Sequence, residues 1–327
     1  MTPGRGVTVL AAGGTIAMAG TGGGPATPEL DADALLAALG GPAGLGDLRA
    51  RTVDTRPSVQ VGAEGALALA RTAAAEASEG RGVVVAHGTD TLEEVAFLCD
   101  LVHGAEAPVV FTGAMRPASA PGADGPANLL DAIAAARAHE AAGLGVLVVL
   151  AGEVHAARAV RKVDSTAPGA FASPGLGPLG RVVEGRLRLD RRVERRPALD
   201  VRRLDARVDL VAAGMGTDGA LVDAAVEAGA HGLVAVALGA GHSPPPFVEA
   251  VARAAARVPV VATVRPERGA ILHATYGFEG AEGDLRASGA LCAAALSPAA
   301  ARVKLMACLG AGLDRAAIAA AFAPDDR

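Results

Sequence analysis

The sequence predicts an α/β protein with two parts: an N-terminal domain built on a doubly wound, mainly parallel sheet, and a second, smaller α/β domain. Short apolar runs rich in Val and Leu alternate along the chain with Ala-rich stretches of helical periodicity. Apolar runs of four to eight residues between helices are typical of parallel strands that are buried on both faces. The chain has 327 residues, 51% of them hydrophobic, which is enough to build two such cores.

Strands and helices alternate regularly over the first 152 residues. The apolar runs predict strands at 7–10, 50–55, 82–86, 108–113 and 146–152. The stretches between them predict helices at 31–39, 63–77, 91–103 and 125–139. The first helix starts at Asp31, a favourable capping residue. The third carries Glu93 and Glu94 in its first turn, next to the positive end of the helix dipole.

The alternation stops between residues 186 and 207, in a stretch that is dense in Arg and contains Pro197. We interpret this stretch as a solvated linker with one edge strand. A nucleic-acid patch is the alternative, which the interleaved acidic residues disfavour. We therefore expect an N-terminal α/β domain over 1–185, a linker over 186–207 and a C-terminal α/β domain over 208–327. The last domain is predicted to hold strands at 208–213, 232–238 and 258–264 and helices at 220–228, 247–256, 298–308 and 314–321.

Composition argues against several classes of function. The net charge of −5 and the aromatic content of 2% disfavour a nucleic-acid partner. The longest apolar stretch, 143–152, is too short to span a bilayer, and no secretory signal is evident, so we expect a cytoplasmic protein with no membrane partner. Cys99, Cys292 and Cys308 are expected to be buried thiols. The seven His residues show no metal-ligand spacing, so no metal is expected.

Two stretches match the GxGxxG pattern, Gly214–Gly219 and Gly175–Gly180. The first lies between a predicted strand and a predicted helix, as a dinucleotide-binding loop does. However, it lacks the acidic residue about twenty positions further on that would bind the ribose. A nucleotide-dependent enzyme therefore remains a minor alternative.

Two threonines follow predicted strands. Ligands bind beyond the carboxyl ends of parallel strands, so we expect the loops after Leu10, Ala86 and Phe111 to lie along one edge. Thr15 lies in GGTIA after the first strand, and Thr89 lies in HGTDTLEE after the third. Either hydroxyl could simply complete a loop or a helix start. The small residues around each also leave backbone N–H groups free to stabilise an oxyanion, which suggests acyl-transfer chemistry.

A hydroxyl nucleophile needs a base at neutral pH. The chain has 30 basic residues, of which only Lys162 and Lys304 are lysines. Arg cannot give up its proton, whereas a desolvated Lys can act as a base. Lys162, in AVRKVDST, lies just past the strand predicted at 146–152 and is the favoured candidate.

At this point the sequence resembles the bacterial type L-asparaginase family. GVVVAHGTDTL, at 82–92, is similar to the second signature of that family. AGGTIA, at 12–17, is similar to the first signature, except that Ala12 replaces the usual Thr. Three further blocks resemble the family and extend the likeness over nearly the whole chain: TGAMRPASAPGADGPANLLDA, AFASPGLGPLG and SPAAARVKLM, at 112–132, 170–180 and 297–306.

The resemblance implies an N-terminal catalytic domain that hydrolyses the side-chain amide of L-asparagine to aspartate and ammonia. It implies that Thr15 is the nucleophile that becomes acylated. It assigns Thr89, Asp90 and Lys162 to a second catalytic group, with Asp90 also pairing with the α-ammonium of the substrate.

The resemblance also implies a binding site and an assembly. Ser58 would bind the α-carboxylate, and the backbone of Gly88 and Ala114 would line the pocket. No metal or organic cofactor is implied, and the partner is a small molecule. Sites between the domains of adjacent subunits imply a homodimer or a homotetramer.

The chain departs from the family in the loop at 17–31, which contains no Tyr, although the family usually places one there. Tyr276, from this subunit or a neighbouring one, water or Lys162 could replace it. His242 stands where some members have Asn, so asparagine or glutamine preference stays open. A non-catalytic asparagine- or aspartate-binding protein is the alternative from another class. The run Gly22–Gly24 predicts a flexible lid.

Overall fold

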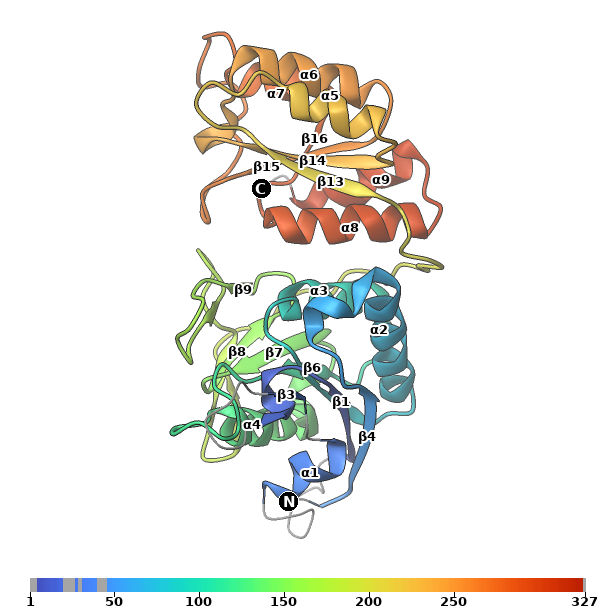
Figure 1. Cartoon of the computed structure of the whole chain (residues 1–327), viewed down its shortest axis with the longest axis vertical. Helices are drawn as coiled ribbons and strands as arrows, with labels where there is room; N and C mark the ends of the chain where they lie inside the picture. The colour runs from blue at the N-terminus through green and yellow to red at the C-terminus, as the bar shows by residue number, and fades with distance from the viewer. Residues whose placement is uncertain (1–4, 20–26, 29–30, 40–45, 326–327) are drawn as a thin grey trace. The chain divides into compact units, whose positions relative to one another are not determined.

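The computed structural model describes residues 5–19, 27–28, 31–39 and 46–325. It divides the chain into two compact units, Met1–Ala198 and Leu199–Arg327 (Figure 1). Of the stretch predicted as a linker, residues up to 198 thus belong to the first unit and the remainder to the second. The predicted lid at Gly22–Gly24 lies outside the described residues.

The first unit is built on an eight-stranded sheet in the order β12-β11-β8-β7-β6-β5-β1-β4. Its five parallel strands are β1 Val7–Ala12, β4 Leu48–Asp54, β5 Gly82–His87, β6 Val109–Thr112 and β7 Val146–Leu150. Its three antiparallel strands are β8 Glu153–Ala156, β11 Gly180–Val183 and β12 Arg186–Leu189. The prediction of a mainly parallel sheet in an α/β fold is confirmed.

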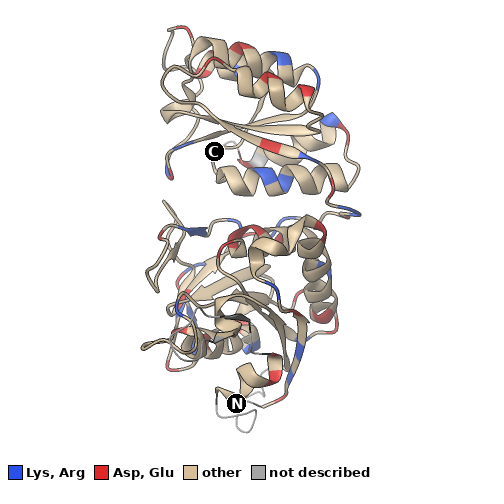
Figure 2. Ribbon diagram, in the orientation of Figure 1, with Lys and Arg blue, Asp and Glu red and all other residues tan. Residues whose placement is uncertain are grey.

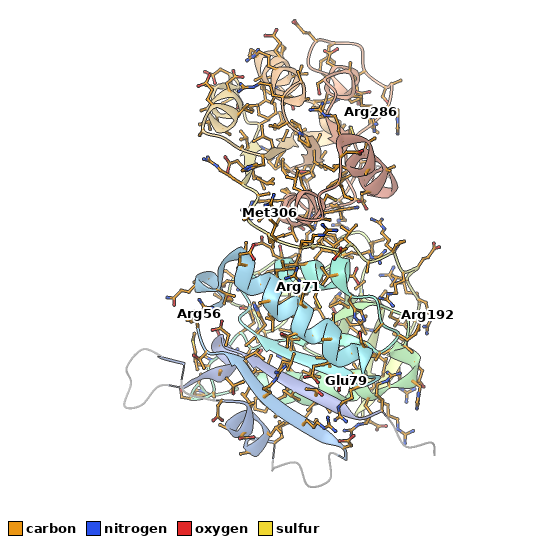
Figure 3. The ribbon with its side chains drawn as sticks, turned by 90° about the vertical axis from the view of Figure 1, so that its right-hand side faces the viewer. Arg56, Arg71, Glu79, Arg192, Arg286 and Met306 are labelled. Carbon is orange, nitrogen blue, oxygen red and sulfur yellow. The ribbon has the colours of Figure 1, made fainter. Side chains whose placement is uncertain are left out.

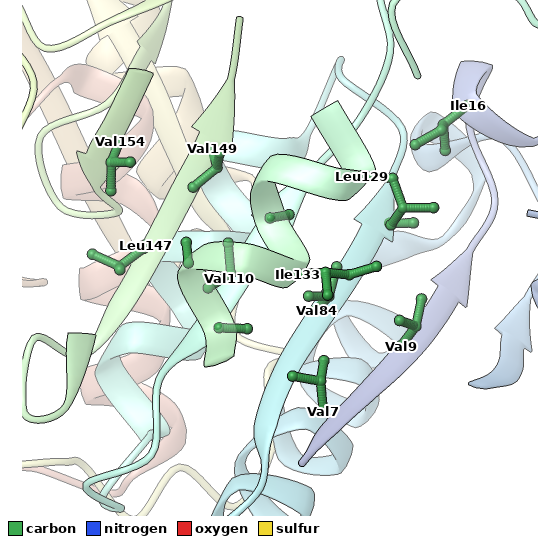
Figure 4. Close-up of a cluster of buried hydrophobic side chains, with 14 of the residues drawn as sticks. Val7, Val9, Ile16, Val84, Val110, Leu129, Ile133, Leu147, Val149 and Val154 are labelled. Atoms are coloured by element: carbon green, nitrogen blue, oxygen red, sulfur yellow. The ribbon is translucent and has the colours of Figure 1, made fainter. Parts of the chain in front are cut away.

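Helices cover both faces of this sheet. Alternate residues of β1 and β5, such as Val7, Val9 and Val84, pack with Leu129 and Ile133 in one cluster of buried side chains (Figure 4). Residues at successive positions of a strand point to opposite faces, so the residues between them lie on the other face. The helices on the first face are α1 Ala32–Ala37 and α4 Gly125–Arg137, and those on the second are α2 Gly62–Ser78 and α3 Leu92–Val102.

Short elements connect the strands near the edge where β1, β5 and β6 end. A 3₁₀ turn, η1, spans Thr15–Ala17, and another, η2, spans Ser58–Gln60. The connection from β8 to β11 carries a two-residue ribbon in which β9 Arg161–Lys162 pairs with β10 Phe171–Ala172. The remaining short elements of this unit are β2 Met18–Ala19, β3 Thr27–Pro28 and η3 His139–Ala141.

The Arg-rich stretch after β12 is held against the first unit by its own guanidinium groups. Arg192, labelled in Figure 3, donates to the carbonyls of Glu140 and Ala142 at 2.8 and 2.7 Å. Arg195 donates to the carbonyl of Ala105 at 2.6 Å and to that of His103. Basic and acidic residues are interspersed over the ribbons of both units (Figure 2). These arginines therefore satisfy backbone acceptors of the protein itself.

The second unit has a parallel four-stranded sheet in the order β13-β14-β15-β16. Its strands are β13 Val208–Ala212, β14 Gly232–Ala237, β15 Val260–Val264 and β16 Leu291–Cys292. The helices α5 and α6 contribute to one buried cluster with β14, and α8 packs against β13, β14 and β15. The helices and 3₁₀ turns are η4 Gly239–Gly241, α5 Ala220–Glu227, α6 Pro245–Ala255, α7 Glu282–Ala287, α8 Pro298–Gly310, α9 Arg315–Phe322 and η5 Ala323–Asp325. The prediction of a second, smaller α/β domain is confirmed.

Lys304 lies inside the second unit. Its Nζ donates to the carbonyl of Ala321 at 2.7 Å and forms an ion pair with Asp325. It also lies 4.7 Å from the centroid of the Phe322 ring. The side chains of Lys304 and Asp325 are 4% and 1% exposed, so this lysine holds the C-terminal helix in place.

The GxGxxG stretch at Gly214–Gly219 connects β13 to α5. The side chain of Thr217 accepts from the backbone N–H of Gly214 at 2.8 Å. The side chain of Asp218 accepts from the N–H of Ala220 at 3.0 Å. The loop thus uses its own side chains on N–H groups that a bound phosphate would need.

Two features of the described residues bear on the classes of function considered above. No helix in the residues that the structure describes is both long and apolar enough to cross a membrane. Within the same residues, no three His, Cys, Asp or Glu side chains come together as a metal site. The three cysteines are buried free thiols. Burial raises the pKa of Cys99 above its usual range and that of Cys308 to about 11, so neither is a thiolate at neutral pH.

Candidate active site

Three loops meet at the carboxyl end of the parallel strands through their backbones. Gly14, with φ of +84°, lies so close to the loop after β5 that a Cβ on it would be 2.1 Å from the Cα of Gly88. A Cβ on Gly88 would in turn be 2.8 Å from the Oγ of Ser58. Thr15 follows Gly14 directly, at the start of η1. The fold therefore brings the segments of Thr15, Ser58 and Gly88 together, of which the sequence predicts the loops of Thr15 and Gly88 at this edge.

Ser58 is positioned by a charged turn after β4. The guanidinium of Arg56, labelled in Figure 3, pairs with the carboxylate of Asp54 at 2.6 Å. The backbone N–H of Arg56 donates to the same carboxylate at 2.8 Å. These hydrogen bonds hold the pKa of Asp54 below its usual value. The turn leaves Ser58 buried at the first position of η2.

Thr89, Asp90 and Lys162 form one hydrogen-bonded group. The Nζ of Lys162 donates to the Oγ1 of Thr89 at 3.0 Å and to the Oδ1 of Asp90 at 2.9 Å. Thr89 is buried, whereas the side chain of Asp90 is 65% exposed and so is available to a soluble ligand. An amine between a buried hydroxyl and an exposed carboxylate can exchange a proton with the hydroxyl and leave the carboxylate to bind a cation.

His87, the last residue of β5, supports the backbone of the loop that carries Gly88 and Thr89. Its Nδ1 lies 2.8 Å from the carbonyl oxygen of Gly88, to which it donates. Burial lowers the pKa of His87, so the ring is neutral. The hydrogen bond orients the peptide group between Gly88 and Thr89.

The loop after β6 contributes Ala114, which is fully buried. The side chain of Asn128 donates to the carbonyl of Gly113 at 3.0 Å, and its oxygen accepts from the N–H of Ala151 at 2.9 Å. The carboxylate of Asp124 accepts from the N–H of Met115 at 3.0 Å. Sequence reasoning missed Asp124 and Asn128 as supports of Ala114, although both lie in the block at 112–132.

Tyr276 and His242 lie in the second unit. The ring of His242 contacts those of Tyr276 and Phe278 edge-on, with centroids 4.9 and 5.0 Å away. The buried carboxylate of Glu282 lies 3.3 Å from the Nε2 of His242 and accepts the N–H of Tyr276 at 2.9 Å. Tyr276 is 49% exposed. The described residues of the predicted loop at 17–31 contain no Tyr.

The comparisons with known proteins show which family the two units resemble. Residues 6–195 match the family described as Asparaginase, N-terminal, and residues 207–322 match the Glutaminase/Asparaginase C-terminal domain. A probable L-asparaginase of Deinococcus radiodurans is 41% identical over 243 residues, which cover 73% of this chain and 74% of that protein. A probable periplasmic L-asparaginase of Haemophilus influenzae is 32% identical over 308 residues, which cover 91% of this chain and 87% of that protein.

A solved structure shows the same similarity in three dimensions. The crystal structure of a probable cytoplasmic L-asparaginase from Campylobacter jejuni has a TM-score of 0.85 and 30% identity to this chain. The match covers 97% of this chain and 99% of that one. With both of its units matched in the family's own order, this chain belongs to the bacterial-type asparaginase family and is an amidohydrolase.

Proposed function

We propose that this amidohydrolase is an L-asparaginase that releases ammonia from the side chain of L-asparagine through an acyl-enzyme on Thr15. The observation that carries the proposal is the lysine held between a hydroxyl and a carboxylate. Lys162 Nζ lies 3.0 Å from Thr89 Oγ1 and 2.9 Å from Asp90 Oδ1. The relatives named L-asparaginase support the choice of substrate.

In the proposed reaction, the Oγ of Thr15 attacks the side-chain carbonyl carbon and loses its proton to the group of Thr89 and Lys162. The new C–O bond gives a tetrahedral intermediate, whose negative oxygen is stabilised by backbone N–H groups. Collapse of the intermediate breaks the C–N bond, and the leaving nitrogen takes a proton and departs as ammonia. Water then adds to the ester, releases aspartate and restores the hydroxyl of Thr15.

The proposed binding roles follow from charge. The exposed carboxylate of Asp90 pairs with the α-ammonium of the substrate, and Ser58 donates to its α-carboxylate. The backbone of Gly88 and Ala114 lines the pocket between them. No metal or organic cofactor takes part in this scheme.

The experiment that tests the proposal compares ammonia release from L-asparagine and L-glutamine by the wild type and by Thr15→Ala. We expect release from L-asparagine by the wild type, and loss of that release in a folded Thr15→Ala protein. Release at wild-type rates by Thr15→Ala would disprove the role of Thr15. Faster release from L-glutamine would favour the glutamine-preferring alternative, because one methylene changes discrimination by only about 1–3 kcal/mol.

The absence of Tyr from the sequence of the loop at 17–31 favours one alternative function, that of a non-catalytic binding protein. Without a Tyr in that loop, the chain could bind asparagine or aspartate without turning it over. Aspartate binding by calorimetry, combined with no ammonia release from either amide, would establish this binding function. Turnover at a rate typical of enzymes would eliminate it.

We further propose a cytoplasmic homodimer or homotetramer. An exposed Tyr276 is consistent with a residue that contacts a neighbouring subunit. Light scattering tests this assembly, and a fully active monomer would contradict it. Cell fractionation tests the location, since the relatives include one named cytoplasmic and one named periplasmic.

A further inference from the structure

Lys162 is held at two points by a single short segment of chain. Its Nζ donates to Thr89 and Asp90, and its backbone N–H donates to the Oε2 of Glu93. Glu93 lies in the first turn of α3, three residues after Asp90. The partners of the backbone and of the side chain of Lys162 therefore all lie within the short segment 89–93.

The ribbon that carries Lys162 is short. Strands β9 and β10 pair over only two residues each, with Lys162 opposite Phe171. Isolated two-stranded pairings of this kind are marginally stable. The hydrogen bond from Lys162 to Glu93 ties the ribbon to α3, which packs against α2 and the sheet.

We propose that Glu93 is a positioning residue for Lys162: its carboxylate fixes the backbone of β9 so that Nζ reaches Thr89 and Asp90 together. The catalytic part of this inference rests on the proposed function. Glu93 does not touch the substrate in this scheme and acts through Lys162.

Glu93 also bears on the charge of Lys162. Burial raises the pKa of Glu93, while the hydrogen bond from the Lys162 N–H and the positive charges of Arg161 and Lys162 oppose that rise. Asp90 is bonded to the ammonium directly, and the charges of Glu94 and Arg161 act on Glu93. A carboxylate near an ammonium favours its charged form. Removing the charge of Glu93 should thus make Lys162 easier to deprotonate.

Three variants separate position from charge. Glu93→Gln keeps an oxygen that can accept from the Lys162 N–H but removes the negative charge. Glu93→Ala removes both the acceptor and the charge. Glu94→Gln removes a neighbouring charge on the same turn of α3 and is the matched control.

The first measurement needs no turnover. The chain has two lysines, and Lys304 is buried in its ion pair with Asp325. Brief acetylation with trace acetic anhydride at a series of pH values, followed by trypsin, reports on Lys162 through the peptide Lys162–Arg181. We expect Glu93→Gln to move the midpoint of Lys162 acetylation to lower pH by about 0.5 unit, and Glu94→Gln to move it by less. Identical midpoints in the wild type and Glu93→Gln would overturn the charge effect.

The second measurement is the pH profile of kcat/KM for ammonia release from L-asparagine. We expect the acid limb of Glu93→Gln to move in the same direction as the acetylation midpoint, with kcat within about threefold of wild type. Glu93→Ala should lower kcat about 10- to 100-fold, because loss of the acceptor of the partly buried Lys162 N–H lets β9 shift. Its affinity for aspartate should change by less than about threefold.

The outcomes distinguish this inference from the proposed function. Wild-type protein without amidase activity would end the proposed function, and the acetylation midpoints would still decide whether Glu93 acts on Lys162. An active wild type whose Glu93→Ala variant loses only thermal stability, with kcat and the pH profile unchanged, would show that Glu93 is merely structural. Rescue of kcat in Glu93→Gln relative to Glu93→Ala is the result that supports positioning.

Discussion

We expect Lys162 to serve turnover and Lys304 to serve stability, and replacing each lysine by Met tests the two roles separately. Lys162→Met removes the amine that contacts Thr89 and Asp90 in a partly exposed site. Lys304→Met removes the amine that pairs with Asp325 in the interior of the second unit. We expect the first variant to lose turnover and keep its stability, and the second to lose stability and keep its turnover.

The expected loss in Lys304→Met follows from burial. The carboxylate of Asp325 is 1% exposed, and the Lys304 Nζ also donates to the carbonyl of Ala321 at 2.7 Å. Removing one partner of a buried ion pair costs about 3–5 kcal/mol, because the remaining charge stays buried after it has lost its counter-ion. With about 3–4 °C per kcal/mol for a domain of this size, the melting midpoint should fall by roughly 10–20 °C.

Urea unfolding followed by circular dichroism measures the stability of both variants, and ammonia release at 25 °C measures their turnover per folded molecule. Lys304→Met combined with Asp325→Leu should recover most of the stability, since an apolar replacement of both partners leaves no buried charge. Equal losses of turnover in Lys162→Met and Lys304→Met would refute the assignment of Lys162. A stability of Lys304→Met within 1 kcal/mol of wild type would refute the energetic argument.

Two further predictions concern the backbone contact and a buried histidine. Gly14→Ala should lower kcat by about 100-fold or more, because its Cβ would lie 2.1 Å from the Cα of Gly88 and must push the two loops apart; an unchanged kcat in steady-state assays would contradict this. Burial and the nearby Arg195 lower the pKa of His103 to about 4, against 6.5 for a free His. Between these two pH values His103 is therefore protonated in the unfolded chain and neutral in the folded one. Stability should therefore fall by about 3 kcal/mol as the pH drops from 6.5 to 4, and His103→Gln should show a smaller fall in urea titrations at pH 7, 5.5 and 4.5.

Much of the fold could be predicted from local pattern. The predicted strand at 82–86 and helix at 91–103 correspond to β5 at 82–87 and α3 at 92–102, because buried parallel strands and amphipathic helices have clear periodicities. The hairpin of β11 and β12 could not be predicted in the same way. Only one edge strand is expected from the sequence of the stretch that contains β12, and the place of the hairpin in the sheet depends on β8, which lies 24 or more residues earlier in the sequence.

The residues of the candidate site likewise include some that the sequence predicts and some that it does not. Thr15, Thr89 and Lys162 stand in recognisable sequence contexts, and the structure brings Thr89 and Lys162 into contact. The supporting contacts are of another kind. Glu93 and Asn128 both hydrogen-bond to backbone groups, and the partner of Glu93 lies 69 residues away in the sequence. Every residue type except Pro offers the same backbone donor and acceptor, so the sequence does not indicate which backbone group such a side chain will contact.

The contact of Gly14 with Gly88 has a consequence for how this protein could be altered. The spacing between these two loops is set by main-chain atoms, so a side chain introduced at either glycine would push its neighbours away. The packed residues on one face of the sheet, such as Val9 and Val84, contact other side chains instead, and volume-conserving exchanges are tolerated best at such positions. Engineering for thermal robustness can therefore begin in that interior, whereas a new substrate has to be sought at the residues proposed to bind the substrate, such as Ser58 and Asp90.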